Sequence, residues 1–220
     1  MKDFDKDEYA TAYVADMETK IPGYQLIFEL IFSGVLPVEL ANRKPTHILS
    51  IGGGEIELGR LAHSFPLAEI TVIDPSSKML DLTKERFEAT SRLANHQFIN
   101  LPFEEYPLTK EAELSLCLLV LHFIEDKQAF LGKLYQSLTA DGIAIISVFT
   151  PYHLDWWQSF ALSQGANQAE VRQMATNPAK LMAKAQSESI ETVAKAAGFF
   201  EVEKIAHILP VEVWLLKKRQ

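Results

Sequence analysis

Short apolar runs alternate with helix-type patterns through the middle of the chain. The runs at 47–51, 70–73, 97–99, 114–120 and 143–149 are rich in Ile, Val, Leu and Phe, as expected for strands that are buried on both faces. Between most of these runs, apolar residues recur at helical spacing. Alternation of this kind predicts a doubly wound, mostly parallel α/β sheet, in which ligands bind beyond the carboxyl ends of the strands.

Helical patterns also precede the first predicted strand. Residues 3–20 and a second stretch from Tyr24 to about Leu36 each carry an apolar stripe, and Pro22-Gly23 separates them. Pro37 is expected to end the second helix. The first 45 residues therefore predict a helical cover over the sheet.

The pattern changes again after the strand at 143–149. A helical insertion is predicted for residues 150–187, and Ser189 is expected to cap a short helix that ends at Gly198. Two further strands, 199–207 and 211–217, have no crossover helix between them and must pair antiparallel. The predicted fold is one domain, 1–220, with a seven-stranded sheet that ends in this hairpin.

The turn after the first predicted strand has the residues of a nucleoside-binding site. Gly52-Gly53-Gly54 lacks Cβ atoms, so backbone N–H groups can approach a ligand, and Asp74 ends the next strand about 20 residues on, where a carboxylate can accept both ribose hydroxyls. The alternatives are a plain tight turn before a helix, and Asp74 as the N-cap of a helix at 75–89.

The glycine spacing indicates which nucleoside is bound. A G-x-G-x-x-G sequence would place a pyrophosphate on the helix N-terminus, but Glu57 stands where the third glycine is required. Glu55 and Glu57 in the first helical turn would also repel a pyrophosphate. A ligand without phosphates fits better, and we expect S-adenosylmethionine, bound by the core at 46–149.

These residues resemble the class I S-adenosylmethionine-dependent methyltransferases over nearly the whole chain. The resemblance rests on Ile48-Leu49-Ser50-Ile51-Gly52-Gly53-Gly54, Val72-Ile73-Asp74, Asp141-Gly142 and Ala197-Gly198-Phe199. Within that superfamily, Ile21-Pro22-Gly23-Tyr24-Gln25 and Leu121-His122-Phe123-Ile124-Glu125 are similar to the carboxy-S-adenosylmethionine synthase family, which serves tRNA wobble-uridine modification. That family implies a cofactor contact for Tyr24.

Four departures qualify this resemblance. Ser50 and Ile56 stand where the superfamily usually has an acid and a third glycine, and Asn100 stands where many members place an acid on the adenine amine. The synthase family carries an arginine in its penultimate helix that holds the additional carboxylate. The matching stretch, 189–198, contains none, and Lys195 is a poor substitute for a bidentate fork. We therefore expect an ordinary methyl donor, with such a synthase and a non-catalytic cofactor-binding protein as the alternatives.

The candidate site has a cofactor part, a catalytic part and an acceptor part. Cofactor contacts are expected from the strand ends and the cover, namely Tyr24, Ser50, Gly52, Gly53, Gly54, Asp74, Pro75, Met79, Asn100, Leu101, Leu118 and Leu119. His122, just past the fourth strand, is the candidate base or acceptor contact, with a histidine packed under the next helix as the alternative.

The acceptor part is expected in the insertion at 150–187, which we interpret as a lid, with Tyr152, His153, Trp156 and Trp157 as its contacts. Adjacent tryptophans on a helix point about 100 degrees apart, so one ring can pack on the sheet while the other faces the cleft or a partner subunit. The alternative places both rings in a local core or a dimer contact.

Composition restricts the remaining possibilities. A net charge of −8 argues against a general nucleic-acid surface, and the acceptor is expected to be a small molecule. No apolar run approaches the roughly 20 residues of a membrane span and no signal-peptide core is present, so we expect a cytoplasmic protein. The single cysteine, Cys117, lies in an apolar run and is interpreted as structural, and no residue set has metal-ligand spacing. A homodimer is left open.

Overall fold

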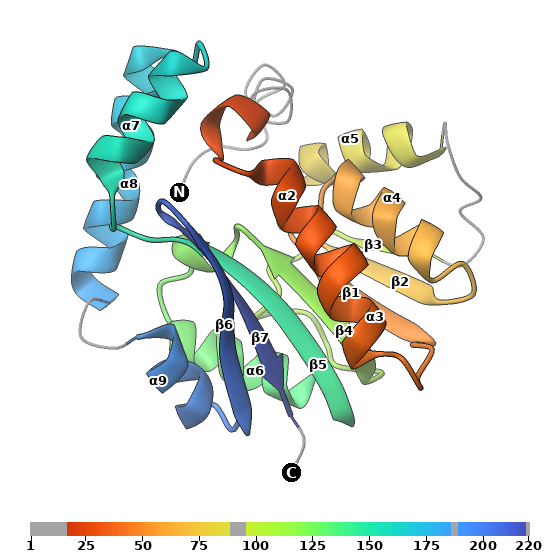
Figure 1. Ribbon diagram of the computed structural model, residues 1–220. Coiled ribbons are helices and arrows are strands. Elements are labelled where there is room, and N and C mark those ends of the chain that lie inside the picture. The colour runs from red at the N-terminus through yellow and green to blue at the C-terminus, as the bar shows by residue number, and fades with distance from the viewer. Residues whose placement is uncertain (1–16, 89–95, 186–188, 219–220) are drawn as a thin grey trace.

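A seven-stranded sheet forms the centre of the protein, in a computed structural model that describes residues 17–88, 96–185 and 189–218 (Figure 1). The strand order is β3-β2-β1-β4-β5-β7-β6. The first five strands pair in parallel, and β7 runs antiparallel to both of its neighbours. The bounds are β1 His47–Ile51, β2 Glu69–Ile73, β3 His96–Ile99, β4 Ala112–Leu118, β5 Leu138–Phe149, β6 Glu201–Ile208 and β7 Val211–Lys217. The predicted doubly wound sheet with a closing antiparallel hairpin is confirmed.

Helices cover both faces of this sheet (Figure 1). One face carries α2 (Tyr24–Glu29), the π-helical η1 (Leu30–Val35), α3 (Leu36–Glu39), α4 (Glu55–Ser64) and α5 (Ser77–Glu88), and the other carries α6 (Lys127–Gln136) and α9 (Ile190–Ala196). Ile48 belongs to the buried cluster of the first face, together with Leu58, while its neighbour Leu49 belongs to the cluster of the second face, together with Phe130. Because successive side chains of a strand point to opposite faces, all five residues of β1 are buried.

The N-terminal cover differs in detail from its prediction. Most of the first predicted helix, 3–20, lies outside the described residues. Its described part, 17–20, is helical. The second helix was expected to end at Pro37, and this is wrong, because the helix continues through η1 and α3 to Glu39. Pro37 lies in the first turn of α3, where a residue without a backbone N–H is tolerated.

The observed bounds of β4 and β5 differ clearly from the predicted bounds. β4 is Ala112–Leu118 and ends two residues early, because Leu119 adopts a left-handed conformation with φ 57° and leaves the ladder. β5 begins at Leu138 rather than at 143, because Leu138 pairs with Ala112 and the chain stays extended through residues 139–142. The register shifts there, so these residues form an irregularity within a longer strand.

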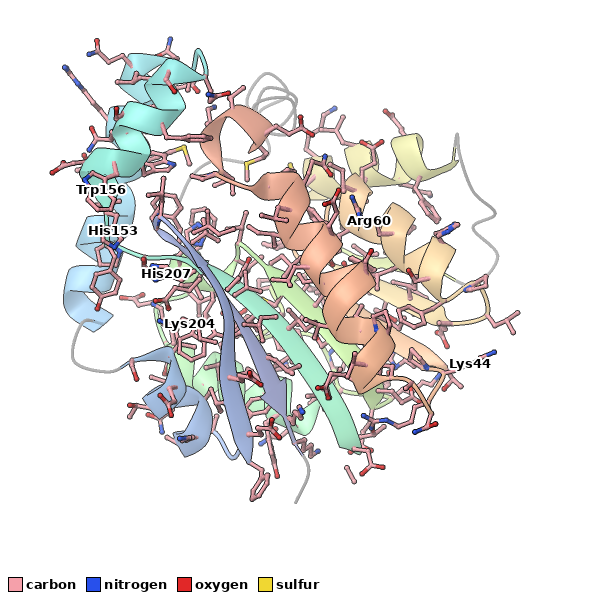
Figure 2. The ribbon with its side chains drawn as sticks, in the orientation of Figure 1. Lys44, Arg60, His153, Trp156, Lys204 and His207 are labelled. Carbon is pink, nitrogen blue, oxygen red and sulfur yellow. The ribbon has the colours of Figure 1, made fainter. Side chains whose placement is uncertain are left out.

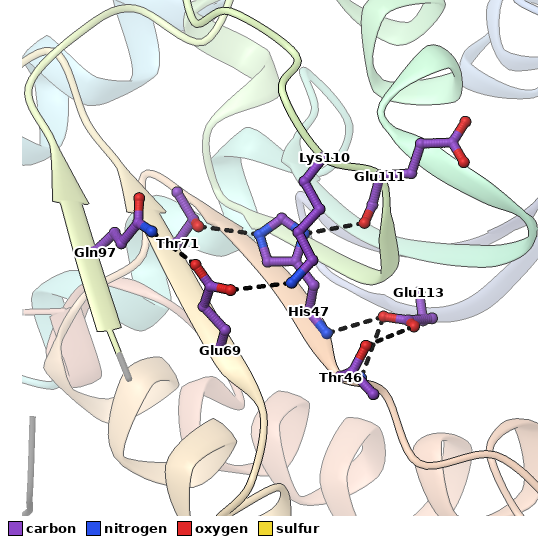
Figure 3. A network of polar contacts seen from close by, with 8 residues as sticks. All are labelled: Thr46, His47, Glu69, Thr71, Gln97, Lys110, Glu111 and Glu113. Atoms are coloured by element: carbon purple, nitrogen blue, oxygen red, sulfur yellow. Dashed lines mark hydrogen bonds and ion pairs between the residues drawn. The ribbon is translucent and has the colours of Figure 1, made fainter. Parts of the chain in front are cut away.

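A network of polar contacts joins the amino ends of the central strands (Figure 3). His47 is 2% exposed, and its ring nitrogens lie 3.0 Å from the Glu111 carbonyl oxygen and 3.0 Å from Thr71 Oγ1. The carboxylate of Glu113 accepts hydrogen bonds from the backbone N–H groups of Thr46 and His47. Buried polar groups are stable only when they are paired, and this pairing fixes β1 and β4 in register at the end opposite the site.

Segments that are far apart in sequence meet at the carboxyl end of β5. The insertion forms α7 (Leu154–Ser163) and α8 (Gln168–Ala185), which lie beside the β6–β7 turn (Figure 1). The buried indole of Trp157 donates to the carbonyl oxygen of Lys20 at 2.5 Å, and Lys20 Nζ pairs with Glu170 at 2.5 Å. The N-terminal cover is thereby joined to both helices of the insertion.

Candidate functional site

The glycine turn lies where β1 leaves the sheet beside β4, the point at which the strand order reverses. Gly52 has φ 66°, and its N–H donates to the Ile73 carbonyl oxygen at 2.8 Å. A Cβ at Gly52 would collide with Val120, and one at Gly53 would collide with the Ser50 hydroxyl. The turn can therefore be built only with glycines at these two positions.

The same turn leaves room and hydrogen-bond donors for a ligand. A Cβ at Gly54 would meet nothing within 4 Å. In the described part of the chain, the N–H groups of Gly53 and Gly54 donate no hydrogen bond. Backbone N–H groups that are not paired with protein acceptors are suited to the carboxylate or hydroxyl oxygens of a bound molecule.

Asp74 follows β2 at the same edge of the sheet. Its Oδ1 accepts the Ser76 N–H at 2.7 Å, and Ser76 Oγ accepts the Met79 N–H at 3.2 Å. The alternative in which Asp74 caps a helix at 75–89 is wrong, because α5 begins at Ser77 and Ser76 is its cap. Asp74 is half-buried, with its carboxylate held by the turn.

Asn100 joins the ends of β2 and β3. Its side-chain amide donates to the carbonyl oxygens of Asp74 at 3.1 Å and Pro75 at 3.0 Å. The neighbouring Leu101 is half-buried beside it. The structure thus joins Asn100, Asp74 and Pro75, at the ends of β2 and β3, by hydrogen bonds.

The end of the fourth strand lies on the other side of the glycine turn. It holds Leu118 and Leu119, and His122 follows shortly after. Leu119 donates its N–H to Ser147 Oγ at 2.9 Å, which holds its left-handed conformation. His122 lies in the short 3₁₀ helix η2 (Leu121–Phe123) and is 7% exposed. Its Nδ1 is 3.5 Å from the Phe149 nitrogen, and its ring packs between Phe123 and Phe149. His122 therefore lies in the wall between β4 and β5.

The structure adds Glu57, which the sequence interpretation treated only as a charge that repels pyrophosphate. Glu57 is 3% exposed, and its Oε1 accepts the Ser50 hydroxyl at 2.5 Å. Burial raises the pKa of its carboxyl to about 7. A signal existed in the sequence, since Glu57 shares a helical face with Leu61, four residues on, and that face packs on the sheet.

Tyr24 approaches this acid from the N-terminal cover. Burial, and then the nearby carboxylates of Glu57, Glu18 and Glu55, raise the pKa of Tyr24 to about 12, so its hydroxyl keeps its proton. The ring packs edge-on against Phe28 at 5.2 Å. The predicted cofactor residue of the cover thus lies near the glycine turn.

The predicted acceptor residues lie at the start of α7 and separate into two environments. Trp157 is fully buried and packs edge-on against Phe149 at 5.0 Å, whereas Trp156 is 65% exposed and stacks on His153 at 4.7 Å (Figure 2). His153 also faces His207 of β6 at 5.9 Å, and Tyr152 is 59% exposed. The two tryptophan rings therefore point apart, as helical geometry predicts.

A pocket of about 510 Å³ lies at the amino end of the sheet, and its lining includes Lys217, which pairs with both Glu39 and Glu201. No group of three or more His, Cys, Asp and Glu side chains in the described segments could hold a metal ion, and no described helix could cross a membrane. Cys117 is buried in β4, and burial raises the pKa of its thiol.

Comparisons with known proteins agree with this architecture. Residues 49–144 match a family described as a methyltransferase domain. Carboxy-S-adenosyl-L-methionine synthase of Dichelobacter nodosus is 27% identical over 228 residues, which cover 98% of this chain and 93% of that protein. Malonyl-(acyl-carrier protein) O-methyltransferase of Acetivibrio thermocellus is 29% identical over 113 residues, 51% of this chain and 38% of that protein.

Solved structures share the fold at low sequence identity. The plantazolicin methyltransferase BpumL, in complex with SAH, matches with a TM-score of 0.62 and 13% identity over 98% of this chain and 92% of that chain. The domain match at 49–144 and the near-full-length relative support a class I S-adenosylmethionine-dependent methyltransferase. The order of the strands and the solved structures agree with that fold.

Proposed function

We propose that this protein is an S-adenosylmethionine-dependent methyltransferase that acts on a small-molecule acceptor. The observation that carries the proposal is the pairing of two features at adjacent strand ends. The turn after β1 presents the unpaired N–H groups of Gly53 and Gly54, and the turn after β2 presents the carboxylate of Asp74. Together they suit a ligand that joins a ribose to a group with acceptor oxygens.

The residues present fit such a cofactor, because the turn leaves space at Gly54 and the Asp74 carboxylate lies at the next strand end. Asp74 would accept the ribose hydroxyls, Asn100 and Leu101 would hold the adenine, and the glycine turn and Tyr24 would hold the methionyl end. When bound, S-adenosylmethionine supplies a methyl group activated by its sulfonium. The protein then has to orient the acceptor in line with that methyl group and exclude water.

The acceptor side is formed by the insertion. Tyr152, His153 and Trp156 offer exposed aromatic surface where α7 begins, directly after β5. The net charge of −8 favours a small acceptor over a polyanion. We propose that the α7–α8 pair acts as the acceptor-binding lid. We also propose that His122, in the wall between β4 and β5, contacts the acceptor. An acceptor that is already nucleophilic needs no general base.

Calorimetry with S-adenosylhomocysteine tests the cofactor assignment. Hydrogen bonds to a charged acceptor are worth about 1.5–3 kcal/mol each, so Asp74→Ala should weaken binding at least roughly tenfold. Ser76→Ala is the matched control, because it removes the cap of α5 and leaves the Asp74 carboxylate in place. Equal affinity for the wild type and Asp74→Ala would refute the assignment of the ribose to Asp74.

A carboxy-S-adenosylmethionine synthase is the second candidate, because a relative with that name matches the chain over nearly its full length. Against it, α9 contains no arginine, and its Lys195 is 54% exposed and pairs with Glu191 at 2.6 Å. The additional carboxylate of such a donor would lack a bidentate partner from this helix. Competition between the ordinary and the carboxylated donor distinguishes the two candidates. We expect preference for the ordinary donor, and recovery of the carboxylated form bound to the purified protein would select the synthase.

A further inference from the structure

Glu57 is a buried carboxylate directly beneath the glycine turn. It belongs to the first turn of α4, and its Oε1 lies 2.8 Å from the point where a Cβ at Gly53 would stand. Its hydrogen bond to Ser50 Oγ turns the carboxylate toward the end of β1. The Glu57 carboxylate therefore lies at the end of β1, next to Ser50, although it belongs to α4.

The carboxylate has no cation to balance it among the described residues. Among the described residues, the ionisable groups whose pKa Glu57 raises are Tyr24 and Cys117, and neither is a cation. Arg60, one turn further along α4, instead donates to Gln25 and stacks over Phe28. A buried carboxyl without a cation has a raised pKa, and ionisable groups perturbed in this way cluster at ligand-binding and active sites.

The order of the strands shows which part of the cofactor reaches this acid. On the proposed function, the ribose lies at β2 and the adenine at β3, so the opposite end of the molecule extends over β1 and toward β4. That end is an α-amino acid, with one carboxylate and one ammonium group. The N–H groups of Gly53 and Gly54 are donors for the carboxylate, and the ammonium needs an anionic partner close by.

We propose that Glu57, oriented by Ser50, recognises the α-ammonium group of the cofactor's methionyl end. This inference rests on the proposed function and assigns a specificity-determining role to a residue outside the glycine turn. Glu57 then distinguishes ligands that keep the amino-acid end from nucleosides that lack it.

Proton release accompanies binding if this assignment is correct. A positive partner favours the ionised carboxylate, so a Glu57 that is protonated in the free protein gives up its proton when the ligand binds. With the pKa near 7, affinity for S-adenosylhomocysteine should rise about fivefold between pH 6 and pH 7. Glu18, Glu55, Tyr24 and Cys117 also face this region, so the variant that removes Glu57 is needed to assign the effect.

The test compares two ligands by calorimetry at pH 7.5. S-adenosylhomocysteine carries the amino-acid end, and 5′-methylthioadenosine keeps the adenine and ribose but lacks that end. Glu57→Gln keeps the shape and removes the charge, and Glu55→Gln, in the same helical turn, is the matched control. We expect Glu57→Gln to weaken S-adenosylhomocysteine about 10- to 100-fold and to leave 5′-methylthioadenosine unchanged. The control should change neither affinity.

Ser50→Ala provides a second variant, because it removes the hydroxyl that orients the carboxylate. It should weaken S-adenosylhomocysteine alone, with a smaller effect than Glu57→Gln. Unchanged binding of S-adenosylhomocysteine to Glu57→Gln would overturn the inference, as would equal weakening of both ligands, which would indicate a role in shaping the turn. If the wild type binds neither ligand, the proposed function fails, and the inference fails with it.

Discussion

Trp157 is expected to be the more important of the two adjacent tryptophans for stability. Its ring is fully buried against Phe149, and its indole N–H donates to the carbonyl oxygen of Lys20 at 2.5 Å. Trp156, one residue earlier on the same helix, is 65% exposed. Replacement of each by alanine makes the same chemical change at two positions with opposite environments.

The size of the effect follows from the buried area. An aromatic side chain of this type buries about 150–250 Å², which at about 25 cal/mol per Å² corresponds to about 4–6 kcal/mol. That value is an upper bound, since an unfolded chain already buries part of its apolar surface. Measured Trp→Ala substitutions in cores cost about 3–5 kcal/mol, so we expect Trp157→Ala to fall in that range. Trp156→Ala should change the free energy of unfolding by less than about 0.5 kcal/mol.

A milder variant isolates the hydrogen bond. Trp157→Phe keeps an aromatic ring but removes the indole N–H, which leaves the Lys20 carbonyl oxygen without that donor. We expect a loss of about 1–3 kcal/mol, which lies below the loss for the alanine variant. Lys20 belongs to the N-terminal cover, so this bond joins α7 to the opposite end of the sequence.

Urea unfolding followed by far-ultraviolet circular dichroism measures all three variants against the wild type. The midpoint should fall in the order Trp156→Ala, Trp157→Phe, Trp157→Ala, with unchanged slopes. Equal destabilisation by the two alanine variants would refute the assignment of one ring to the core and one to the surface.

Two further predictions concern titratable groups. Because burial raises the pKa of Glu57 to about 7, the folded protein binds more protons than the unfolded chain between about pH 4.5 and pH 7, so stability without ligand should fall by about 3 kcal/mol across that window. Glu57→Gln should remove this fall in urea unfolding at several pH values, and an unchanged pH dependence would contradict the raised pKa. His122 is the candidate base or acceptor contact. If it acts as a base, His122→Asn should lower kcat about 100-fold and remove an ionisation from the pH–rate profile once an acceptor is known. If the profile keeps its shape, His122 serves only in packing.

The local patterns of the sequence determined most of the architecture. Strands buried on both faces are continuous apolar runs, and helices keep an apolar stripe, so the alternating elements and the doubly wound sheet were predictable. Gly52 and Asp74 were predictable as well, because a left-handed turn at a strand end and an acid at the next strand end are local features. The short connection between the last two predicted strands likewise indicated the closing hairpin.

Tertiary structure decided the features that depend on which distant groups come into contact. The extent of β5 was set by the pairing of Leu138 with Ala112, which no pattern within 140–142 reveals. The helical period indicated that the two tryptophan rings diverge, but the packing of Phe149 and the cover decided which one is buried. The ionisation of Glu57 depends on its burial under the glycine turn, because desolvation is a property of the folded surroundings and not of the residue type.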